Sequence, residues 1–215
     1  MAHVPHRTVR RLSLYRRLLN RMYAEGVISV YSHELARMAG GTAAQVRRDI
    51  MSVGYAGSPK RGYDVKGLIE HIGSFLDAPE GQRVALVGVG NLGRAILSYF
   101  SGRRPRLAIA AAFDNDPAKT NRVIHGCRCY GDGEIQKVVK ELGIDVAILT
   151  VPAREAQNTA DALVEAGVSG ILNFAPVPLR VPAGVYAEDI DMTMSLETVA
   201  YFARQGAAER QTRPS

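Results

Sequence analysis

A glycine-rich turn between a short apolar run and a helical pattern constrains the fold of this chain more than any other feature. The turn, Gly88-Val89-Gly90-Asn91-Leu92-Gly93, directly follows the apolar run 84–87 and opens a helical pattern that continues to Phe100. The first glycine allows a tight turn, the second lets an anionic group approach the backbone, and the third lets the helix pack closely on the strand. This order of strand, turn and helix is typical of the first βα unit of a parallel sheet.

Apolar runs and helical patterns alternate from residue 83 onward. Buried strands are expected at 84–87, 107–113, 146–151 and 170–174, and helices at 91–100, 133–142 and 154–166. Helices that connect consecutive strands act as crossovers, so the strands they join are parallel. We therefore expect an α/β Rossmann-type domain with a doubly wound sheet.

The residues near the glycine turn fit a dinucleotide. The amino terminus of the helix at Asn91 supplies unpaired N–H groups and partial positive charge to a pyrophosphate. Asp114 ends the next strand, where a carboxylate accepts hydrogen bonds from ribose hydroxyls and repels a 2′-phosphate. Asn115 follows, at a position where an NADP site often has an arginine. Asp116 is the alternative to Asp114 as the carboxylate that binds the ribose. We therefore expect NADH or NAD+ rather than the corresponding NADP forms.

The carboxyl ends of two later strands complete the expected site. Thr150-Val151-Pro152 and Asn173-Phe174-Ala175-Pro176 lie where strand ends frame a bound nucleotide. The alternative is that these prolines only terminate strands. The residues expected to bind the nucleotide are thus Gly88, Val89, Gly90, Asn91, Leu92, Gly93, Asp114, Thr150, Val151, Pro152, Asn173, Phe174, Ala175 and Pro176.

Positive charge is concentrated in the first third of the chain. Residues 1–78 hold 12 Lys and Arg against 6 Asp and Glu, whereas residues 79–215 hold 15 of each, so the net charge of +6 lies entirely in the first part. A basic module joined to a neutral one commonly binds a polyphosphate. The alternative is a solvated basic face without a partner.

The basic segment has the pattern of a helix-turn-helix. Helices are expected at 9–22 and 33–39, and a third begins after Thr42, with Gln45 placed to complete a capping box. One face of the third helix is apolar, and the other presents Gln45 and Arg48 with Arg47 at its flank. Such a helix suits the major groove of DNA, where Gln45 and Arg48 would read base edges.

A turn-rich segment follows the third helix. Residues 54–63 combine glycines with the basic pair Lys60 and Arg61, which suits a β-hairpin wing lying along the DNA backbone. Lys60, Arg61 and Arg47 would then mainly neutralise phosphates. Asp64 can cap a fourth helix, so the first third is expected to be a winged-helix domain.

The sequence offers little for hydride-transfer chemistry, which needs an acid or base beside the nicotinamide. No histidine follows His125 and no lysine follows Lys140, so the late loops contain neither residue. Tyr99, Tyr186, Tyr201 and Asp191 remain as candidates, and catalysis is disfavoured. The main alternative is a small NAD-dependent oxidoreductase whose basic amino-terminal part is an interaction arm.

Membrane, secretory and metal sites are not expected. No apolar run approaches the roughly 20 residues that span a bilayer, and the first residues lack the apolar stretch of a signal peptide. We therefore expect a cytoplasmic protein. Cys127 and Cys129 flank a single residue, too close for a zinc half-site of the usual spacing, and are interpreted as a reduced, inert pair.

Eight stretches spread along the chain resemble one known family, the Rex family of redox-sensing transcriptional repressors. They are Leu12-Ser13-Leu14-Tyr15-Arg16-Arg17, Gln45-Val46-Arg47-Arg48-Asp49, Arg61-Gly62-Tyr63-Asp64-Val65, Gly88-Val89-Gly90-Asn91-Leu92-Gly93, Phe113-Asp114, Thr150-Val151-Pro152, Gly170-Ile171-Leu172-Asn173-Phe174-Ala175-Pro176 and Asp189-Ile190-Asp191. The run around Asn173 is the most specific. The wing departs from the family pattern, because its tip is shortened to Lys60-Arg61-Gly62-Tyr63.

The resemblance implies a homodimer in which a carboxy-terminal helix at about 192–204 swaps onto the partner subunit. Family members bind palindromic operator DNA when free of NADH and release it when NADH binds. Tyr99 matches a family tyrosine near the nicotinamide. Arg17 and Asp191 match an arginine and an aspartate that pair between subunits in one of the two states.

Three parts are therefore expected: a winged-helix DNA-binding domain at 1–79, a Rossmann NAD(H)-binding domain at 80–191, and a swapped helix and tail at 192–215. A second rival is a CoA-binding module, since related folds bind CoA through similar glycine loops. Asp114 speaks against it, because CoA usually carries a 3′-phosphate on the ribose that this residue would meet.

Overall fold

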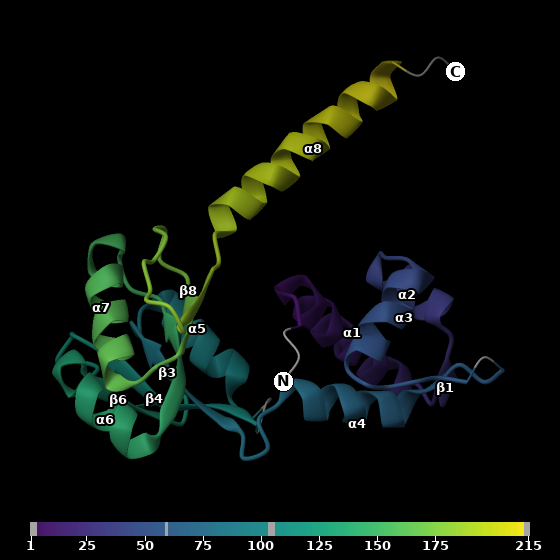
Figure 1. The fold of residues 1–215 in the computed structure, drawn as a ribbon. Helices are drawn as coiled ribbons and strands as arrows, with labels where there is room; N and C mark the ends of the chain where they lie inside the picture. The colour runs from purple at the N-terminus through teal and green to yellow at the C-terminus, as the bar shows by residue number, and fades with distance from the viewer. Residues whose placement is uncertain (1–3, 59, 103–105, 213–215) are drawn as a thin grey trace. The chain divides into compact units, whose positions relative to one another are not determined.

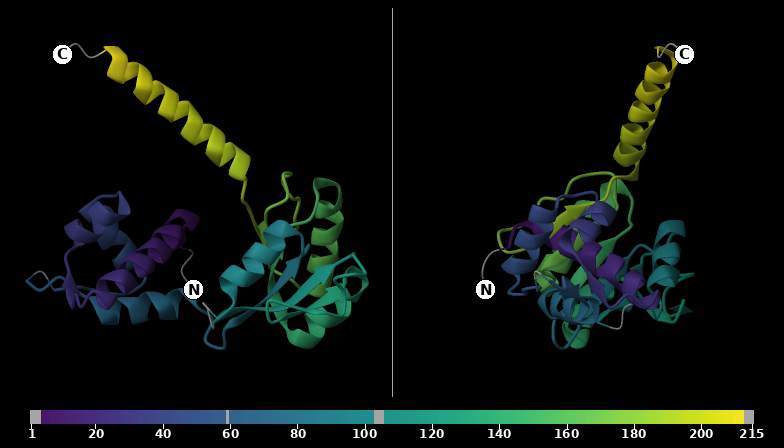
Figure 2. Two further views of the ribbon diagram at one scale, coloured as in Figure 1. Left: turned by 180° about the vertical axis from the view of Figure 1, so that it is seen from behind. Right: turned by 90° about the vertical axis from the view of Figure 1, so that its right-hand side faces the viewer.

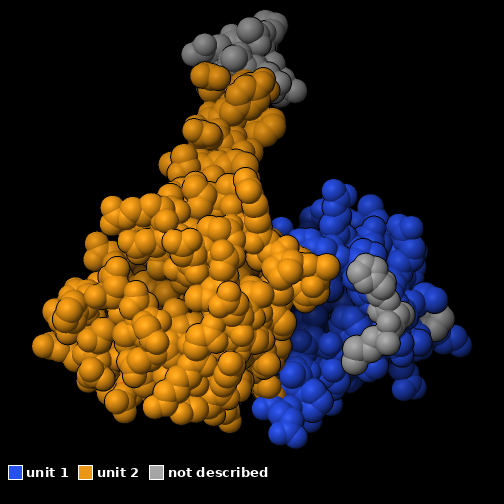
Figure 3. All heavy atoms as spheres, turned by 60° about the vertical axis from the view of Figure 1, so that its left-hand side comes forward, with its two compact units in different colours: residues 1–80 blue, residues 81–215 orange. Residues whose placement is uncertain are grey.

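The computed structural model describes residues 4–58, 60–102 and 106–212, with side chains up to residue 205 of the last helix. The chain forms two compact units, Met1–Glu80 and Gly81–Ser215, coloured separately in Figure 3. Each unit has its own apolar core, so each is described by itself.

The described residues of unit 1 form four helices and a two-stranded sheet, and the helices are labelled in Figure 1. Its elements are α1 (His6–Ala24), β1 (Ser29–Val30), α2 (Ser32–Ala39), α3 (Ala43–Ser52), β2 (Tyr63–Asp64) and α4 (Val65–Leu76). Gly40 ends α2 in the left-handed conformation, and the Asp64 carboxylate caps α4 by accepting from the N–H of Gly67. The order α2, turn, α3 confirms the expected helix-turn-helix.

The apolar stripes of the four helices meet in one core. Leu12 and Leu19 of α1, Ile50 of α3, and Leu68 and Ile72 of α4 are fully buried there. Burial of each such side chain stabilises the folded state by about 1.5–3 kcal/mol, so the apolar face of α3 is held against the core. Its outer face is left for solvent or a ligand.

A polar cluster joins α1 to α3 beside this core. The Asp49 carboxylate accepts from Arg11 Nε at 2.6 Å, from Arg11 Nη2 at 2.8 Å and from the Tyr15 hydroxyl at 3.0 Å. Burial would raise the pKa of Asp49, but the hydrogen bonds from Arg11, Gln45 and Tyr15 outweigh it and hold this pKa below its ordinary value. Burial and the Asp49 carboxylate together raise the pKa of Tyr15 to about 12.

The lowered pKa of Asp49 predicts a pH-dependent stability for unit 1. A carboxyl whose pKa is lower in the folded state stabilises fully above its unfolded pKa of about 4 and stops stabilising as the pH falls through the folded pKa. Asp49→Asn should cost about 1–3 kcal/mol at neutral pH, less than a fully buried pair because Arg11 is partly exposed.

Thermal unfolding of wild type and Asp49→Asn, compared from about pH 7 to about pH 3, measures this contribution. The difference between the two proteins should shrink toward the acid end, because protonation of Asp49, which begins in the unfolded chain, removes the advantage of the charged form. A difference that stays constant with pH would show that the charge of Asp49 is not what stabilises the fold.

The segment after α3 forms a short hairpin. Ser58 and Gly62 pair through two backbone hydrogen bonds of 2.8 Å, while Pro59 lies outside the described residues. The Tyr31 hydroxyl donates to the carbonyl of Lys60, which ties the hairpin tip to the start of α2. Gly62 has a φ of 71°, and a Cβ there would lie 2.5 Å from the carbonyl oxygen of Val30, so only glycine fits. The expected wing is present.

Unit 2 is built on a seven-stranded sheet in the order β5-β6-β4-β3-β7-β8-β9. The strands are β3 (Gln82–Val87), β4 (Leu107–Asp114), β5 (Val123–Ile124), β6 (Cys127–Gly131), β7 (Ile144–Leu149), β8 (Gly170–Asn173) and β9 (Tyr186–Asp189). All pair in parallel except β5, which runs antiparallel to β6 at one edge. The four expected strands are confirmed, and β5, β6 and β9 were not predicted.

Helices cover both faces of this sheet, as Figures 1 and 2 show. They are α5 (Asn91–Phe100), the 3-10 turn η1 (Asp132–Glu134), α6 (Ile135–Leu142) and α7 (Ala153–Ala166). One apolar cluster joins α6 and α7 to the sheet, and a second joins α5 to the other face. The doubly wound Rossmann-type fold is thereby confirmed.

The last helix of unit 2, α8 (Met192–Thr212), extends away from the sheet in Figure 1. Every described side chain from 192 to 205 is exposed, including Leu196 at 69% and Phe202 at 63%. Exposed apolar side chains in such a run need a partner surface. Among the described residues, no helix is long and apolar enough to cross a membrane.

Candidate nucleotide site and nucleic-acid interface

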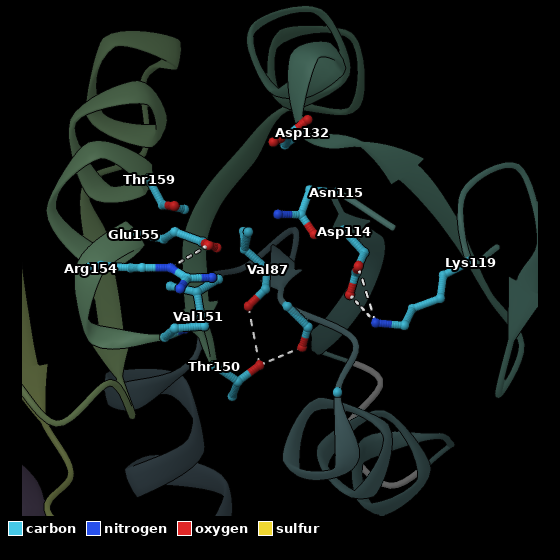
Figure 4. Close-up of a pocket in the computed structure, with 13 residues that line it drawn as sticks. Val87, Asp114, Asn115, Lys119, Asp132, Thr150, Val151, Arg154, Glu155 and Thr159 are labelled. Atoms are coloured by element: carbon cyan, nitrogen blue, oxygen red, sulfur yellow. Dashed lines mark hydrogen bonds and ion pairs between the residues drawn. The ribbon is translucent and has the colours of Figure 1, made fainter. Parts of the chain in front are cut away.

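A cleft of about 520 Å³ opens at the carboxyl ends of the parallel strands of unit 2 (Figure 4). It lies where the strand order reverses between β3 and β7, which is where doubly wound sheets bind their ligands. Its lining residues are Val87, Gly88, Gly90, Asp114, Asn115, Lys119, Asp132, Thr150, Val151, Pro152, Arg154, Glu155 and Thr159.

The glycine turn forms one wall of the cleft and leaves no room for side chains at two of its positions. Gly88 has a φ of 94°, and a Cβ there would lie 2.7 Å from the carbonyl oxygen of Thr150. A Cβ at Gly93 would collide with the carbonyl oxygen of Gly88, so α5 approaches β3 this closely only with glycine. The Thr150 hydroxyl donates to Gly88 O at 2.6 Å and joins the two strand ends.

Gly90 differs from the other two glycines because a Cβ there would meet no atom within 4 Å. Gly90 immediately precedes α5 and lines the cleft, so the free space at this position belongs to the cleft itself. The amino terminus of α5 supplies N–H donors to an anion at the same point. The turn therefore leaves open space for an anionic group such as a pyrophosphate beside the start of α5.

Asp114 ends β4 as expected, but its carboxylate is already engaged within the protein. It accepts from Val89 N at 2.6 Å, from Asp116 N at 2.9 Å and from Lys119 Nζ at 3.1 Å to both oxygens. Burial would raise the pKa of Asp114, but these donors outweigh it and hold this pKa below its ordinary value. Four donor contacts fill the usual acceptor capacity of a carboxylate.

The carboxylate that is predicted to bind the ribose therefore lies in a charged cluster with its neighbours. Lys119 Nζ also lies 3.5 Å from Asp116 Oδ2, so two carboxylates enclose one ammonium group beside the cleft. The three side chains carry a net charge of −1, which disfavours a 2′-phosphate even though a lysine is present. A ribose hydroxyl that bonds to Asp114 would either share the carboxylate with the ammonium group of Lys119 or displace that ammonium group.

Six of the lining residues were not predicted from the sequence. They are Asn115, Lys119, Asp132, Arg154, Glu155 and Thr159, since Val87 belongs to the predicted strand. Arg154, Glu155 and Thr159 come from the first turns of α7, directly after Thr150-Val151-Pro152. The start of a helix that follows a strand lies at the same edge of the sheet as the end of that strand, so polar residues at the start of α7 could have been predicted to line the cleft. Lys119 lies in an irregular turn, and no pattern in the sequence places it at the cleft.

Several predicted nucleotide-site residues do not line this cleft: Val89, Asn91, Leu92, Gly93, Tyr99, Asn173, Phe174, Ala175 and Pro176. Asn173 is fully buried, and its amide nitrogen donates to Val177 O at 2.8 Å and to Asp189 Oδ1 at 2.7 Å. Its amide oxygen accepts from Ala175 N at 2.9 Å. The Asn173 side chain thus shapes the loop after β8 and joins it to β9.

The two cysteines lie on β6 and are both buried and free. Burial, with a smaller contribution from Cys129, raises the pKa of the Cys127 thiol to about 11, and burial also raises the pKa of Cys129. Raised pKa values keep both groups as thiols at neutral pH and therefore unreactive. Among the described residues no group of three or more His, Cys, Asp or Glu could hold a metal ion.

The residues expected to contact DNA lie on α3 and the wing of unit 1. Arg47 and Arg48 are exposed on α3, and Arg47 Nη1 donates to the Ser32 hydroxyl at 3.1 Å. Gln45 is partly buried, and Lys60 and Arg61 are exposed at the wing tip. The fold therefore presents all five side chains from the helix-turn-helix and its wing, as the sequence indicates.

The three residues expected to act in switching belong to different elements. Arg17 is exposed on α1 in unit 1 and Tyr99 is exposed on α5 in unit 2. Asp191 precedes α8, and its carboxylate caps that helix by accepting from Met194 N at 2.9 Å. An additional partner for Asp191 would therefore act directly on the start of α8.

Two family models match parts of the chain. One, described as "CoA binding domain", covers residues 80–177, and the other, described as "Putative DNA-binding protein N-terminus", covers residues 3–50. Each covers less than half of the chain. The CoA binding domain model matches the fold of the CoA-binding module that the sequence left as an alternative. The DNA-binding model agrees with the basic helix-turn-helix.

Similarity to solved structures extends over the whole chain. RSP, a Rex-family repressor, has been solved in complex with beta-NADH, with a TM-score of 0.87 and 30% identity over 99% of this chain and 100% of that one. The complex of RSP with beta-NAD+ and operator DNA gives a TM-score of 0.88 and 31% identity over 98% and 97%.

Sequence comparison leads to the same family. The redox-sensing transcriptional repressor Rex 2 of Enterococcus faecalis is 41% identical over 199 residues, which is 93% of each chain. The relatives are named as transcriptional repressors, and the late loops of this chain contain neither histidine nor lysine. At this identity and coverage, the chain belongs to the Rex family of redox-sensing transcriptional repressors.

Proposed function

We propose that this protein binds palindromic operator DNA as a homodimer and releases it when NADH binds, so that it represses transcription according to the ratio of NADH to NAD+. The observation that supports the proposal is that one chain contains both a basic winged helix, in unit 1, and a Rossmann cleft that can take an anionic group, in unit 2. RSP complexes with beta-NADH, and with beta-NAD+ and operator DNA, support both ligands.

Each part of the chain receives one role in this proposal. Residues 1–79 bind DNA, residues 80–191 bind NAD(H), and residues 192–215 form the helix and tail that swap onto the partner. The exposed apolar side chains of α8 support the swap, since a partner subunit would cover Leu196, Val199 and Phe202. A protein that acts on DNA and reads a metabolic coenzyme is placed in the cytoplasm.

The switch rests on charge. The nicotinamide ring is a cation when oxidised and neutral when reduced, so nearby charged side chains distinguish the two forms. We assign this role to Arg17 and Asp191, with Tyr99 beside the ring. Two recognition helices enter successive major grooves only when they are about 34 Å apart, so a modest rotation of the subunits releases the duplex.

A gel-shift titration tests the proposal. A palindromic duplex, selected by the protein from a random-sequence pool, should be retained with NAD+ and released as NADH is added. CoA at the same concentration should have no effect. Equal retention at every NADH to NAD+ ratio would refute redox sensing, and release by CoA would favour the rival module. Production of oxidised or reduced coenzyme from added substrates would instead support an oxidoreductase.

Coenzyme selectivity gives a separate prediction for Asp114. Asp114→Asn removes one negative charge beside Lys119, so that the ammonium group becomes available to a 2′-phosphate. The affinity for NADPH should rise relative to NADH by about 1 kcal/mol, or roughly fivefold, which is the upper end for an ion pair open to solvent. Titration of each coenzyme by fluorescence measures the ratio.

Asp132→Asn is the matched control for Asp114→Asn, because Asp132 lines the same cleft and loses the same charge but does not contact Lys119. An equal shift in both variants would mean that the net charge of the cleft, rather than the Asp114–Lys119 contact, sets selectivity.

A further inference from the structure

The residue that precedes α2 is a tyrosine, although helix starts favour short polar side chains. Serine, threonine, aspartate and asparagine are preferred there, because their side-chain oxygen accepts from a backbone N–H of the first turn. At the start of α2 the backbone N–H of Tyr31 instead donates to the Glu34 carboxylate at 2.7 Å, an interaction that does not use the phenol. The side chain of Tyr31 is therefore available for another role.

The phenol of Tyr31 contacts the wing at two points. Its hydroxyl donates to the carbonyl of Lys60 at 2.9 Å, across 29 positions of the chain. Its ring lies against Gly62, since a Cβ at Gly62 would be 3.3 Å from ring atom Cδ1 of Tyr31. The ring also stacks on His33, with the two centroids 5.6 Å apart and an angle of 20° between the planes. Tyr31 thus joins the wing tip to the start of the helix-turn-helix.

Hydrogen bonds within the wing fix its shape but not its position. Ser58 and Gly62 bond to each other, and Arg61 N donates to Ser58 O at 3.3 Å. The described residues of the tip, 56–58 and 60–61, are all exposed, so the tip is not held by burial in the core of unit 1. A two-stranded hairpin is only marginally stable by itself. The position of this tip therefore depends on contacts from outside the hairpin, and the Tyr31 hydroxyl provides one.

A hollow of about 330 Å³ lies between the wing and the two helices of the helix-turn-helix. It is lined by Tyr31, Ser32, Arg47, Gly57, Ser58, Gly62 and Tyr63. The major and minor grooves of DNA are separated by a sugar-phosphate backbone, so a helix in one groove and a wing beside it must accommodate that backbone between them. The distance between the wing tip and α3 therefore determines whether both can contact one duplex together.

We propose that Tyr31 is a positioning residue for operator binding, whose hydroxyl holds the wing tip where Lys60 and Arg61 meet the phosphates while α3 occupies the major groove. A tip that is held in place before binding loses less conformational freedom when the duplex arrives, so less of the contact energy is offset by ordering it. This inference rests on the operator-binding function proposed above.

Tyr31→Phe tests the inference, because it removes the hydroxyl and keeps the ring. Lys60 is exposed, so water can bond to its carbonyl instead, and the melting temperature of the protein without DNA should stay unchanged. Affinity for the selected palindromic duplex should fall roughly tenfold, as expected for the loss of one hydrogen bond per subunit. The affinity for NADH should not change.

Tyr23→Phe is the matched control for Tyr31→Phe. It removes the same hydroxyl group from a tyrosine on α1 that is 50% exposed, and it should leave operator affinity unchanged. An equal loss of operator affinity in both variants would overturn the role of Tyr31, because the loss would then not depend on the contact with the wing.

A double-mutant cycle separates positioning of the wing from any other role of Tyr31. The second change is Lys60→Ala together with Arg61→Ala, which removes the charges of the wing but leaves the backbone carbonyl that Tyr31 holds. All proteins are compared by gel shift at one low salt concentration, at which phosphate contacts are strong enough for the wing variant to bind. In that background Tyr31→Phe should cause no further loss, because a wing without its charges gains nothing from being held.

The outcomes separate this inference from the proposed function. A tenfold loss in both backgrounds would overturn the inference, because Tyr31 would then act on the helices or on the DNA directly. An unchanged affinity of Tyr31→Phe with the wing intact would overturn it as well. In either case, a wild type that binds the duplex and releases it with NADH still supports the proposed function. A wild type that retains no duplex would overturn operator binding and this inference together.

Discussion

Replacing Arg48 with alanine should weaken operator binding by about 2–6 kcal/mol while leaving NADH affinity unchanged. Arg48 is exposed on α3, and a bidentate contact of arginine with guanine is worth about 1–3 kcal/mol at each half-site. A homodimer loses two such contacts, one in each half-site. The nucleotide cleft lies in unit 2, so its NADH affinity should not respond.

Gel shifts with the selected palindrome measure the first quantity and fluorescence titration of NADH the second. Arg21→Ala is the matched control, because it removes the same charge from an exposed position on α1 that is paired with Glu25. The control should lower operator affinity only slightly. Loss of both DNA and NADH binding in Arg48→Ala would argue against separate binding modules. An equal loss of operator affinity in Arg48→Ala and Arg21→Ala would mean that Arg48 contributes only positive charge and no specific base contact.

Replacing Gly90 with alanine should leave the fold of the protein without nucleotide intact, yet weaken NADH binding by about 10- to 100-fold. A Cβ at Gly90 meets no protein atom within 4 Å, and the backbone there has an ordinary φ of −76°. The added methyl group projects into the space where a pyrophosphate meets the start of α5. Steric overlap of this kind costs about 1–3 kcal/mol, which corresponds to the expected loss of affinity.

The variant should therefore stay on its operator at NADH concentrations that release the wild type. Gly88→Ala is the contrasting substitution, because its Cβ would lie 2.7 Å from Thr150 O in a left-handed conformation, so it should lower the melting temperature even without nucleotide. An unchanged NADH affinity in Gly90→Ala would place the pyrophosphate elsewhere. A lowered melting temperature without nucleotide would mean that Gly90 serves the fold rather than the ligand.

The elements that were predicted correctly depend on local signals. The glycine turn, the cap at Asp64 and the apolar stripes of α1, α3 and α4 each act within a few residues, so their effects are visible in sequence order. The strands that were missed lack such signals. β6 alternates buried Cys127 and Cys129 with exposed Arg128, and β9 is a polar edge strand, so neither presents an apolar run.

The sequence indicated where the residues of the candidate site lie in the fold, but it did not indicate their hydrogen-bond partners. Asp114 stands at the end of β4 as its spacing indicated, but the donors that fill its carboxylate come from Val89, Asp116 and Lys119. The capping box of Gln45 was wrong in its second half, because Asp49 takes the glutamine amide. The assignment of Asn173 and its neighbours to the nucleotide stays a prediction, and the sequence did not indicate that the Asn173 side chain also bonds to Val177 O and Asp189 Oδ1.

The sequence by itself determined where the backbone must be glycine, which segment carries the positive charge and which face of each helix is buried, because these properties depend on residue type and spacing alone. Only the tertiary structure decided the hydrogen-bonding state of the two buried carboxylates. Arg11 and Asp49 are 38 residues apart, and Val89 and Asp114 are 25 apart. A buried carboxylate takes whichever donors the packed fold brings within about 3 Å, and no local pattern encodes that choice.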